Sequence, residues 1–136
     1  MATTGKFNGT ALLVYIDGVA IGDATTHTLN VSAAMIDATT KSSAGWKDVL
    51  PGLKEWSIDC DGFVAWDATE GVEDSFADLA ARTRVTLKFS TEVTGDARFT
   101  GTAYITSCNV TAAVEDVVSY TMSFDGDGAL TLETVT

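Results

Sequence analysis

The sequence predicts a mainly β protein: a β-sandwich or barrel of about eight to ten strands with one flanking α-helix. Three observations indicate this class. Residues with β-branched side chains, Thr and Val above all, are abundant, and Pro51 is the only proline. Apolar and polar residues alternate with a period of two over most of the chain. A single segment, Glu70 to Ala81, has the period of a helix.

The segments predicted to be extended are runs of β-branched, aromatic or alternating residues bounded by turn residues. In chain order they are 11–16, 19–21, 26–32, 35–39, 55–61, 63–66, 84–90, 98–110, 117–124 and 129–135. Segment 35–39 either extends its predecessor or forms a strand of its own. Asp and Gly together predict tight turns at 17–18, 94–96 and 125–128.

Alternation also predicts which face of a strand each side chain takes. In segment 55–61 the inward residues are Trp56, Ile58 and Cys60, while Ser57, Asp59 and Asp61 point outward. The same pattern places His27, Leu29 and Val31 on one face, Val85, Leu87 and Phe89 inward, and Tyr120, Met122 and Phe124 on one face.

The helix predicted from Glu70 to Ala81 has apolar residues at positions i, i+4, i+7 and i+8, which form one stripe. The stripe consists of Val72, Phe76, Leu79 and Ala80. Acidic residues crowd its first turn and arginines follow its end, as the helix dipole favours.

A long loop is predicted at about 39–54, and it is unusually apolar. It holds Trp46, Val49, Leu50, Pro51 and Leu53 between polar and turn residues. Loops normally run over the surface and are polar, because a buried loop leaves backbone groups unpaired. We therefore interpret these five residues as contacts to a neighbouring molecule, with Trp46, Leu50 and Leu53 as anchors. The alternative is a loop that folds back on its own core.

Charge narrows the classes of partner. The formal net charge is −11, and no cluster of Lys or Arg exists, which argues against tight nucleic-acid binding. No apolar run is long enough to span a membrane, and the first residues lack the pattern of a signal peptide, so we expect a protein made and kept in a cytoplasm. Cys60 and Cys108 are then expected to be reduced, strand-borne thiols.

No catalytic residue, metal site or cofactor is predicted. His27 is the only histidine, so a Ser or Cys nucleophile would have to use it, yet no nucleophile motif is present. A calcium loop that starts at Asp59 fails at Phe63 and Val64, where a ligand and a turn glycine are required. The aromatic residues Trp56, Trp66 and Tyr104 could form a sugar platform, although aromatic residues in strands are more often core.

The loop and its surroundings resemble a known family. The run TTKSSAGWKDVLPGLKEWSIDCDG, the following FVAWDATEG and the late YTMSFDGDGALT are similar to the major tail tube proteins of long-tailed phages, of the type found in lactococcal phage TP901-1. The most specific part is carried by Thr40, Lys41, Ser43, Gly45, Trp46, Lys47, Leu50, Pro51, Gly52 and Trp56.

The resemblance implies one tail-tube domain over residues 1–136, with an assembly loop at 39–54 and termini that stay mobile until neighbours order them. It implies hexameric rings stacked into a virion tail tube, assembled in the host bacterial cytoplasm. Double-stranded DNA would pass through the tube without specific binding. A tape-measure protein, a tail terminator and a baseplate or tail tip would be the other partners. Asp59 and Asp61 are candidates for an acidic, non-adhesive lumen, and the outer surface of the tube is the alternative place for them.

Two other readings stay open at this stage. One is an extracellular β-sandwich module that binds a carbohydrate or a receptor. The other is a related tube protein of a secretion or injection system, which would share the fold without belonging to a virion.

Overall fold

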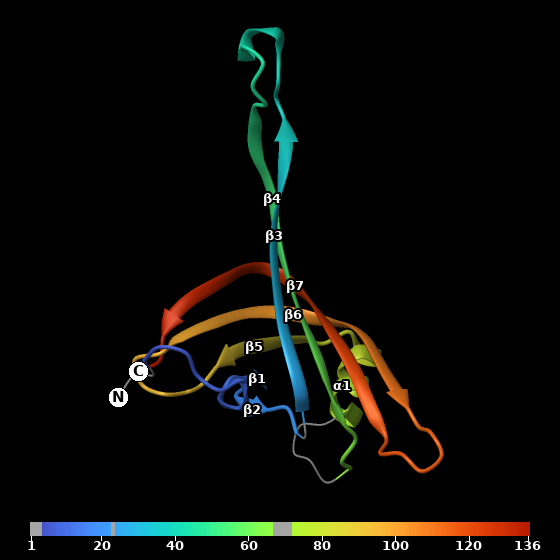
Figure 1. The fold of residues 1–136 in the computed structure, drawn as a ribbon. Coiled ribbons are helices and arrows are strands. Elements are labelled where there is room, and N and C mark those ends of the chain that lie inside the picture. The colour runs from blue at the N-terminus through green and yellow to red at the C-terminus, as the bar shows by residue number, and fades with distance from the viewer. Residues whose placement is uncertain (1–3, 23, 67–71) are drawn as a thin grey trace.

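The computed structural model describes residues 4–22, 24–66 and 72–136, and these form seven strands and one α-helix (Figure 1). The strands are β1 (Leu13–Ile16), β2 (Val19–Ala20), β3 (Ala24–Asp37), β4 (Val49–Phe63), β5 (Arg84–Ser90), β6 (Ala97–Thr111) and β7 (Ser119–Thr134). The helix is α1 (Val72–Ala81), and two 3-10 turns are η1 (Gly9–Ala11) and η2 (Lys41–Ser43).

All seven strands form one antiparallel sheet in the order β2-β1-β5-β6-β7-β4-β3. The sheet curls until β3 meets strands from the other half of this order. The His27 ring on β3 meets the Phe89 ring on β5 edge-on, with their centroids 6.4 Å apart. The Tyr120 hydroxyl on β7 donates to the carbonyl of Gly22 at 3.1 Å. In Figure 1, β3 and β4 accordingly run across the direction of β5 and β6.

The core lies on the inner face of this curled sheet, and alternation places its residues there. The outward and inward sets expected in segment 55–61 are confirmed, as are Val85 and Leu87. Helix α1 packs against β6, where it buries Ser75 fully and Leu79 partly. The buried side chains include Val14, Ile16, Trp56, Ile58, Cys60, Val85, Leu87, Ala103, Ile105, Tyr120, Met122 and Phe124. None of the helical segments described is long and apolar enough to cross a membrane.

The expected number of strands is too high, because several expected segments are continuous. Segments 26–32 and 35–39 are both part of β3, and 117–124 and 129–135 are both part of β7. The turn expected at 125–128 is therefore wrong. Gly126 lies within β7 and makes room for the Trp56 ring, which a Cβ atom at this position would overlap. Its glycine reflects a close approach rather than a turn.

The stripe expected on the helix is wrong in part. Phe76 is 62% exposed and Ala80 is exposed, whereas Ser75 and Leu79 face the sheet. The small Ser75 side chain lets the helix approach β6 closely. The face of the helix that packs against the sheet is therefore the one with Ser75 and Leu79, and not the one with Phe76. Glu70, the expected start of the helix, lies outside the described residues.

Candidate assembly surfaces

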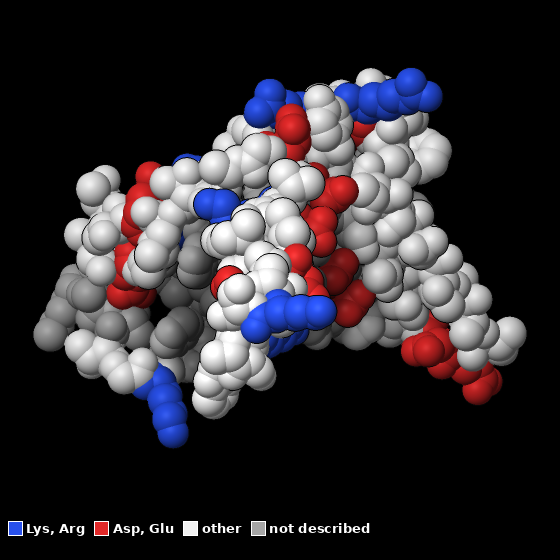
Figure 2. All heavy atoms as spheres, turned by 90° about the horizontal axis from the view of Figure 1, so that it is seen from above, with Lys and Arg blue, Asp and Glu red and all other residues white. Residues whose placement is uncertain are grey.

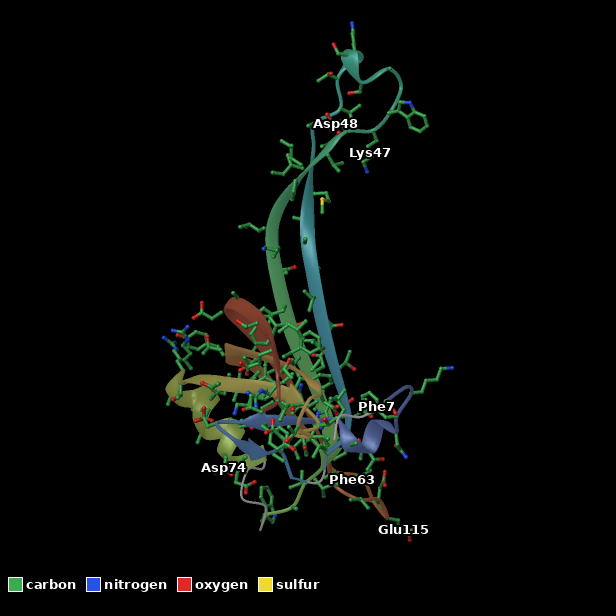
Figure 3. All side chains as sticks on the ribbon, turned by 90° about the vertical axis from the view of Figure 1, so that its left-hand side faces the viewer. Phe7, Lys47, Asp48, Phe63, Asp74 and Glu115 are labelled. Carbon is green, nitrogen blue, oxygen red and sulfur yellow. The ribbon has the colours of Figure 1, made fainter. Side chains whose placement is uncertain are left out.

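The β3–β4 hairpin extends well beyond the rest of the sheet (Figure 1). Strand β7 pairs with β4 only from Ser57 onward, so the part of β4 before Ser57 pairs with β3 alone. We call residues 31–55 the arm. Figure 3 shows Lys47 and Asp48 at its tip, at the opposite end of the molecule from Phe63 and Asp74. The last part of the segment expected as a loop, residues 49–54, is thus strand, and the connection between β3 and β4 is limited to residues 38–48.

The arm contains a β-bulge. Ala33 is paired with Lys54 and Met35 with Pro51, so Ala34 stands opposite both Gly52 and Leu53. A Cβ atom on Gly52 would lie 3.1 Å from the carbonyl oxygen of Ala34, which makes a larger residue there unfavourable. The bulge changes which face the following residues of β4 take.

Beyond the bulge the arm is apolar on both faces. Directly paired residues share a face of a two-stranded ribbon, and successive residues alternate. Met35 and Pro51 therefore lie on one face, and Ile36 and Leu50 on the other. An isolated two-stranded ribbon is only marginally stable in water. Such an arm gains stability when neighbours cover it.

The five residues expected as contacts lie on the arm, and all of them are exposed. Trp46 is 79% and Leu53 is 87% exposed, and Val49, Leu50 and Pro51 are exposed as well. In the isolated chain this segment does not fold back on the core. The structure adds three exposed apolar residues from β3, namely Val31, Met35 and Ile36. The adjacent pair Met35-Ile36 breaks the alternation of β3, and this was the signal available in the sequence.

Local hydrogen bonds order the tip of the arm. The Asp48 amide donates to the Thr39 hydroxyl at 2.8 Å, and the Ala38 amide donates to the Asp48 carbonyl at 2.8 Å. Thr40 and Ser43 form a capping box around η2. Ala44 and Gly45 then take left-handed conformations, with φ of 55° and 85°. These bonds hold the backbone that carries Trp46, so the indole is presented by a structured tip.

The outer face of the sheet is the second candidate surface, and it is polar and acidic. Asp59 accepts hydrogen bonds from Asn30 Nδ2 at 3.0 Å and Ser123 Oγ at 2.8 Å, while Asp61 is exposed. Figure 2 looks down on the molecule from the side of the arm and shows Asp and Glu side chains gathered in a band beside it. The acids that the strand register places on the outer face are Glu55, Asp59, Asp61, Asp125 and Asp127.

The histidine and the two cysteines, which were considered for catalysis or metal binding, are wholly or partly buried. His27 Nδ1 lies 3.3 Å from Cys60 Sγ, and burial lowers the pKa of His27 while nearby Asp61 opposes this. Burial, with smaller contributions from Asp59 and Asp61, raises the pKa of Cys60 to about 12. Cys60 and Cys108 are thiols and form no disulfide. Within the described ranges, no group of three or more His, Cys, Asp or Glu side chains could hold a metal ion.

The thiols are separated by the sheet itself. Met122 of β7 is paired with Cys60 on one side and with Cys108 on the other. Two strand spacings put the cysteine Cα atoms about 10 Å apart, beyond the roughly 7 Å limit for a disulfide.

Solved structures share this fold. The tail of an empty gene transfer agent particle, solved with C6 symmetry, superposes with a TM-score of 0.83 at 22% identity, covering 95% of this chain and 100% of that one. The tail tube of SPP1 superposes with a TM-score of 0.74 at 13% identity, covering 95% of this chain and 80% of that one. The sheath/tube terminator of an extracellular contractile injection system, PVC, superposes with a TM-score of 0.68 at 13% identity, covering 98% of this chain and 100% of that one.

Sequence comparison identifies the family. A search of curated proteins gives no match. The family model described as "Phage tail tube protein" matches residues 6–132, nearly the whole chain, and this family is structural and not enzymatic. The chain belongs to the phage tail tube protein family.

Proposed function

We propose that this chain is the subunit of a tail tube, in which hexameric rings stack and the arm binds a neighbouring subunit. The observation that carries the proposal is the projecting arm, which is exposed and, beyond its bulge, apolar on both faces. Truncating a buried aromatic or aliphatic anchor removes a large share of an interface's energy. Trp46, Leu50 and Leu53 are the anchors, and Val49 and Pro51 complete the contact surface.

The edge of the sheet supports the formation of rings. Strand β3 is an edge strand of 14 residues, and among the described strands it pairs only with β4. A long open edge offers unpaired backbone groups to a strand of the next subunit. Identical subunits joined head to tail in this way close into a ring when the rotation per subunit allows it. The C6 symmetry of the gene transfer agent tail supports six subunits.

The acidic outer face of the sheet fits the wall of a DNA conduit. Six copies at −11 would carry a formal charge of −66 per ring. A wall without a cationic patch releases no counterions from DNA, so it does not bind DNA electrostatically. We assign Asp59 and Asp61 to this lumen, through which double-stranded DNA passes without specific binding.

The remaining parts of the proposal follow from the family resemblance. The chain is one tail-tube domain of the TP901-1 type, located in the virion tail and assembled in the cytoplasm of the host bacterium. A tape-measure protein lies inside the tube, a tail terminator at one end and a baseplate or tail tip at the other. Matches to a gene transfer agent and to a contractile injection system support a wider set of particles with the same tube.

The experiment is light scattering with negative-stain electron microscopy on the purified protein over a concentration series. We expect hollow six-fold rings or tubes above a threshold concentration. A protein that stays monomeric alone, and also fails to polymerise when baseplate and tape-measure proteins are added, would contradict the proposal.

A further inference from the structure

A second exposed apolar surface lies at the end of the molecule away from the arm tip. Trp66, Phe76 and Val110 are 73%, 62% and 52% exposed, and with Glu73 and Cys108 they line a cleft of about 330 Å³. We call these five residues the helix patch. Contiguous apolar surface of this kind marks a site of interaction more often than scattered single residues do.

The helix patch also contains an unsatisfied acceptor. Glu73 Oε2 is buried and has no hydrogen-bond partner among the described residues. A buried polar atom without a partner costs free energy, which Glu73 would recover by turning its carboxylate toward a donor supplied from outside. Glu73 stands in the first turn of α1 and lines the cleft, so its carboxylate brings negative charge to the helix patch. The missing donor is therefore best supplied by a cation.

The arm tip has the complementary chemistry. Two of the eight basic residues of the chain, Lys41 and Lys47, lie in the connection at the tip of the arm, which also holds Asp48. Lys47 directly follows Trp46, the most exposed aromatic residue among those described. The tip thus offers an indole and an ammonium group on consecutive residues, which matches an apolar cleft that is also lined by a carboxylate.

We propose that the helix patch of one subunit receives the arm tip of a second copy, with Trp46 against Phe76 and Trp66 and with Lys47 beside Glu73. This inference rests on the proposed function, in which the arm binds a neighbour, and it names the surface that the arm binds.

The positions of the two surfaces determine which kind of assembly the contact produces. The tip, marked by Lys47, and the first turn of α1, marked by Asp74, lie at opposite ends of the molecule (Figure 3). Each subunit has one tip and one patch, so the contact is heterologous and continues from copy to copy. Two helix patches facing each other would instead bring Glu73 and Asp74 of both copies together, and like charges disfavour that arrangement.

Cross-linking tests the contact directly. We expect a short bismaleimide to join Asp48→Cys of one copy, a variant that keeps Lys47, to the native Cys108 of the next, because Cys60 is fully buried and Cys108 lines the patch. A head-to-tail contact gives a ladder of dimers, trimers and larger species, and Cys108→Ser added to this variant abolishes it. The matched control is Glu115→Cys, in the β6–β7 connection, which gives no ladder. A product that stops at dimers, or a ladder that survives Cys108→Ser, would overturn the proposal.

Assembly measurements supply the second test. We expect Phe76→Ala to raise the protein concentration needed for tubes by about tenfold or more, as loss of an interface anchor does. Leu132→Ala, at an exposed leucine on β7, is the matched control and leaves it unchanged. Glu73→Lys and Lys47→Glu each weaken assembly, and the double variant restores it. Thermal unfolding verifies that each variant is folded.

The outcomes separate this inference from the proposed function. If the wild type forms tubes, Phe76→Ala and Trp66→Ala form them equally well and no ladder appears, the helix patch is not the docking surface although the tube function stands. A ladder without tubes supports the docking contact and counts against the tube. Neither tubes nor ladder overturns both.

Discussion

The indole of Trp56, on β4, covers Gly126 on β7, and its Nε1 donates to the carbonyl of Gly128 at 3.1 Å. Gly101 of β6 lies under the same ring, where a Cβ atom would come within 2.7 Å of Trp56 Cζ2. The ring therefore occupies a space that two glycines of adjacent strands leave open. Trp56 lies at the base of the arm, next to Ser57 where β7 pairing begins, so this contact fixes the point at which the arm leaves the body.

We expect Gly126→Ala to destabilise the monomer by about 1–3 kcal/mol, because the new methyl group must displace the Trp56 ring in a close-packed core. Chemical denaturation monitored by tryptophan fluorescence measures the loss. Gly9→Ala is the matched control, since a Cβ atom there meets nothing within 4 Å and Gly9 has no positive φ. Equal stability of the two variants would contradict this account of the glycine.

Substitutions of Trp46, on the arm, and Trp56, at its base, are expected to separate folding from assembly. Trp56→Ala removes a buried ring and should cost about 3–5 kcal/mol of monomer stability. Trp46→Ala removes an exposed ring and should leave monomer unfolding within about 0.5 kcal/mol of wild type. Negative-stain microscopy should nevertheless show tubes lost or reduced in Trp46→Ala. Normal tubes from this variant would remove Trp46 from the anchors.

His27 is expected to make stability depend on pH. Burial against Phe89 and Cys60 lowers its pKa below the ordinary 6.5, so near this pH the unfolded chain binds more protons than the folded one. Stability contributed by neutral His27 is complete well above pH 6.5 and is lost as pH falls through the lowered pKa.

Urea unfolding of wild type and His27→Leu from about pH 7.5 to about pH 5.5 measures this effect. The stability of the wild type should fall relative to that of the variant over this range, and the difference should be constant at higher pH. Parallel curves throughout would show that His27 does not titrate in the unfolding reaction.

Asp61 is expected to affect how DNA moves through the tube. If it faces the lumen, Asp61→Lys places a ring of ammonium groups there, and the tubes should retain duplex DNA at low salt and release it steeply as salt rises. Retained DNA should be protected from nuclease. Glu115→Lys is the control. DNA that binds Asp61→Lys tubes but is fully digested would place Asp61 on the outside.

The sequence was a good guide to the class of the fold and to its strand faces, because burial on one face leaves alternation in the parts of the strands that cover the core. Inward residues such as Ile58, Met122 and Leu87 follow from this pattern alone. The ends of the strands could be predicted less well from the sequence. Nothing local distinguishes a turn glycine from Gly126, whose role depends on a tryptophan 70 residues away in the chain.

The arm illustrates the same limit at the candidate site. Its apolar residues were visible in the sequence, and so was their conflict with an ordinary loop. Their arrangement on two faces was not, because it depends on the pairing of Ala34 with both Gly52 and Leu53. Phe76 was misplaced for a related reason. Helical periodicity identifies a stripe of apolar residues but does not say whether its own sheet or another molecule covers it.

The two-faced arm has a kinetic consequence. A ribbon with Met35 and Pro51 on one side and Ile36 and Leu50 on the other is covered completely only when neighbours lie on both sides. The first pair of subunits to meet would cover one side and gain little, while a subunit that joins an existing ring would gain from both. Growth from free protein should therefore begin with a lag that preformed ends abolish. Because of this nucleation step, a template would determine when and where polymerisation begins.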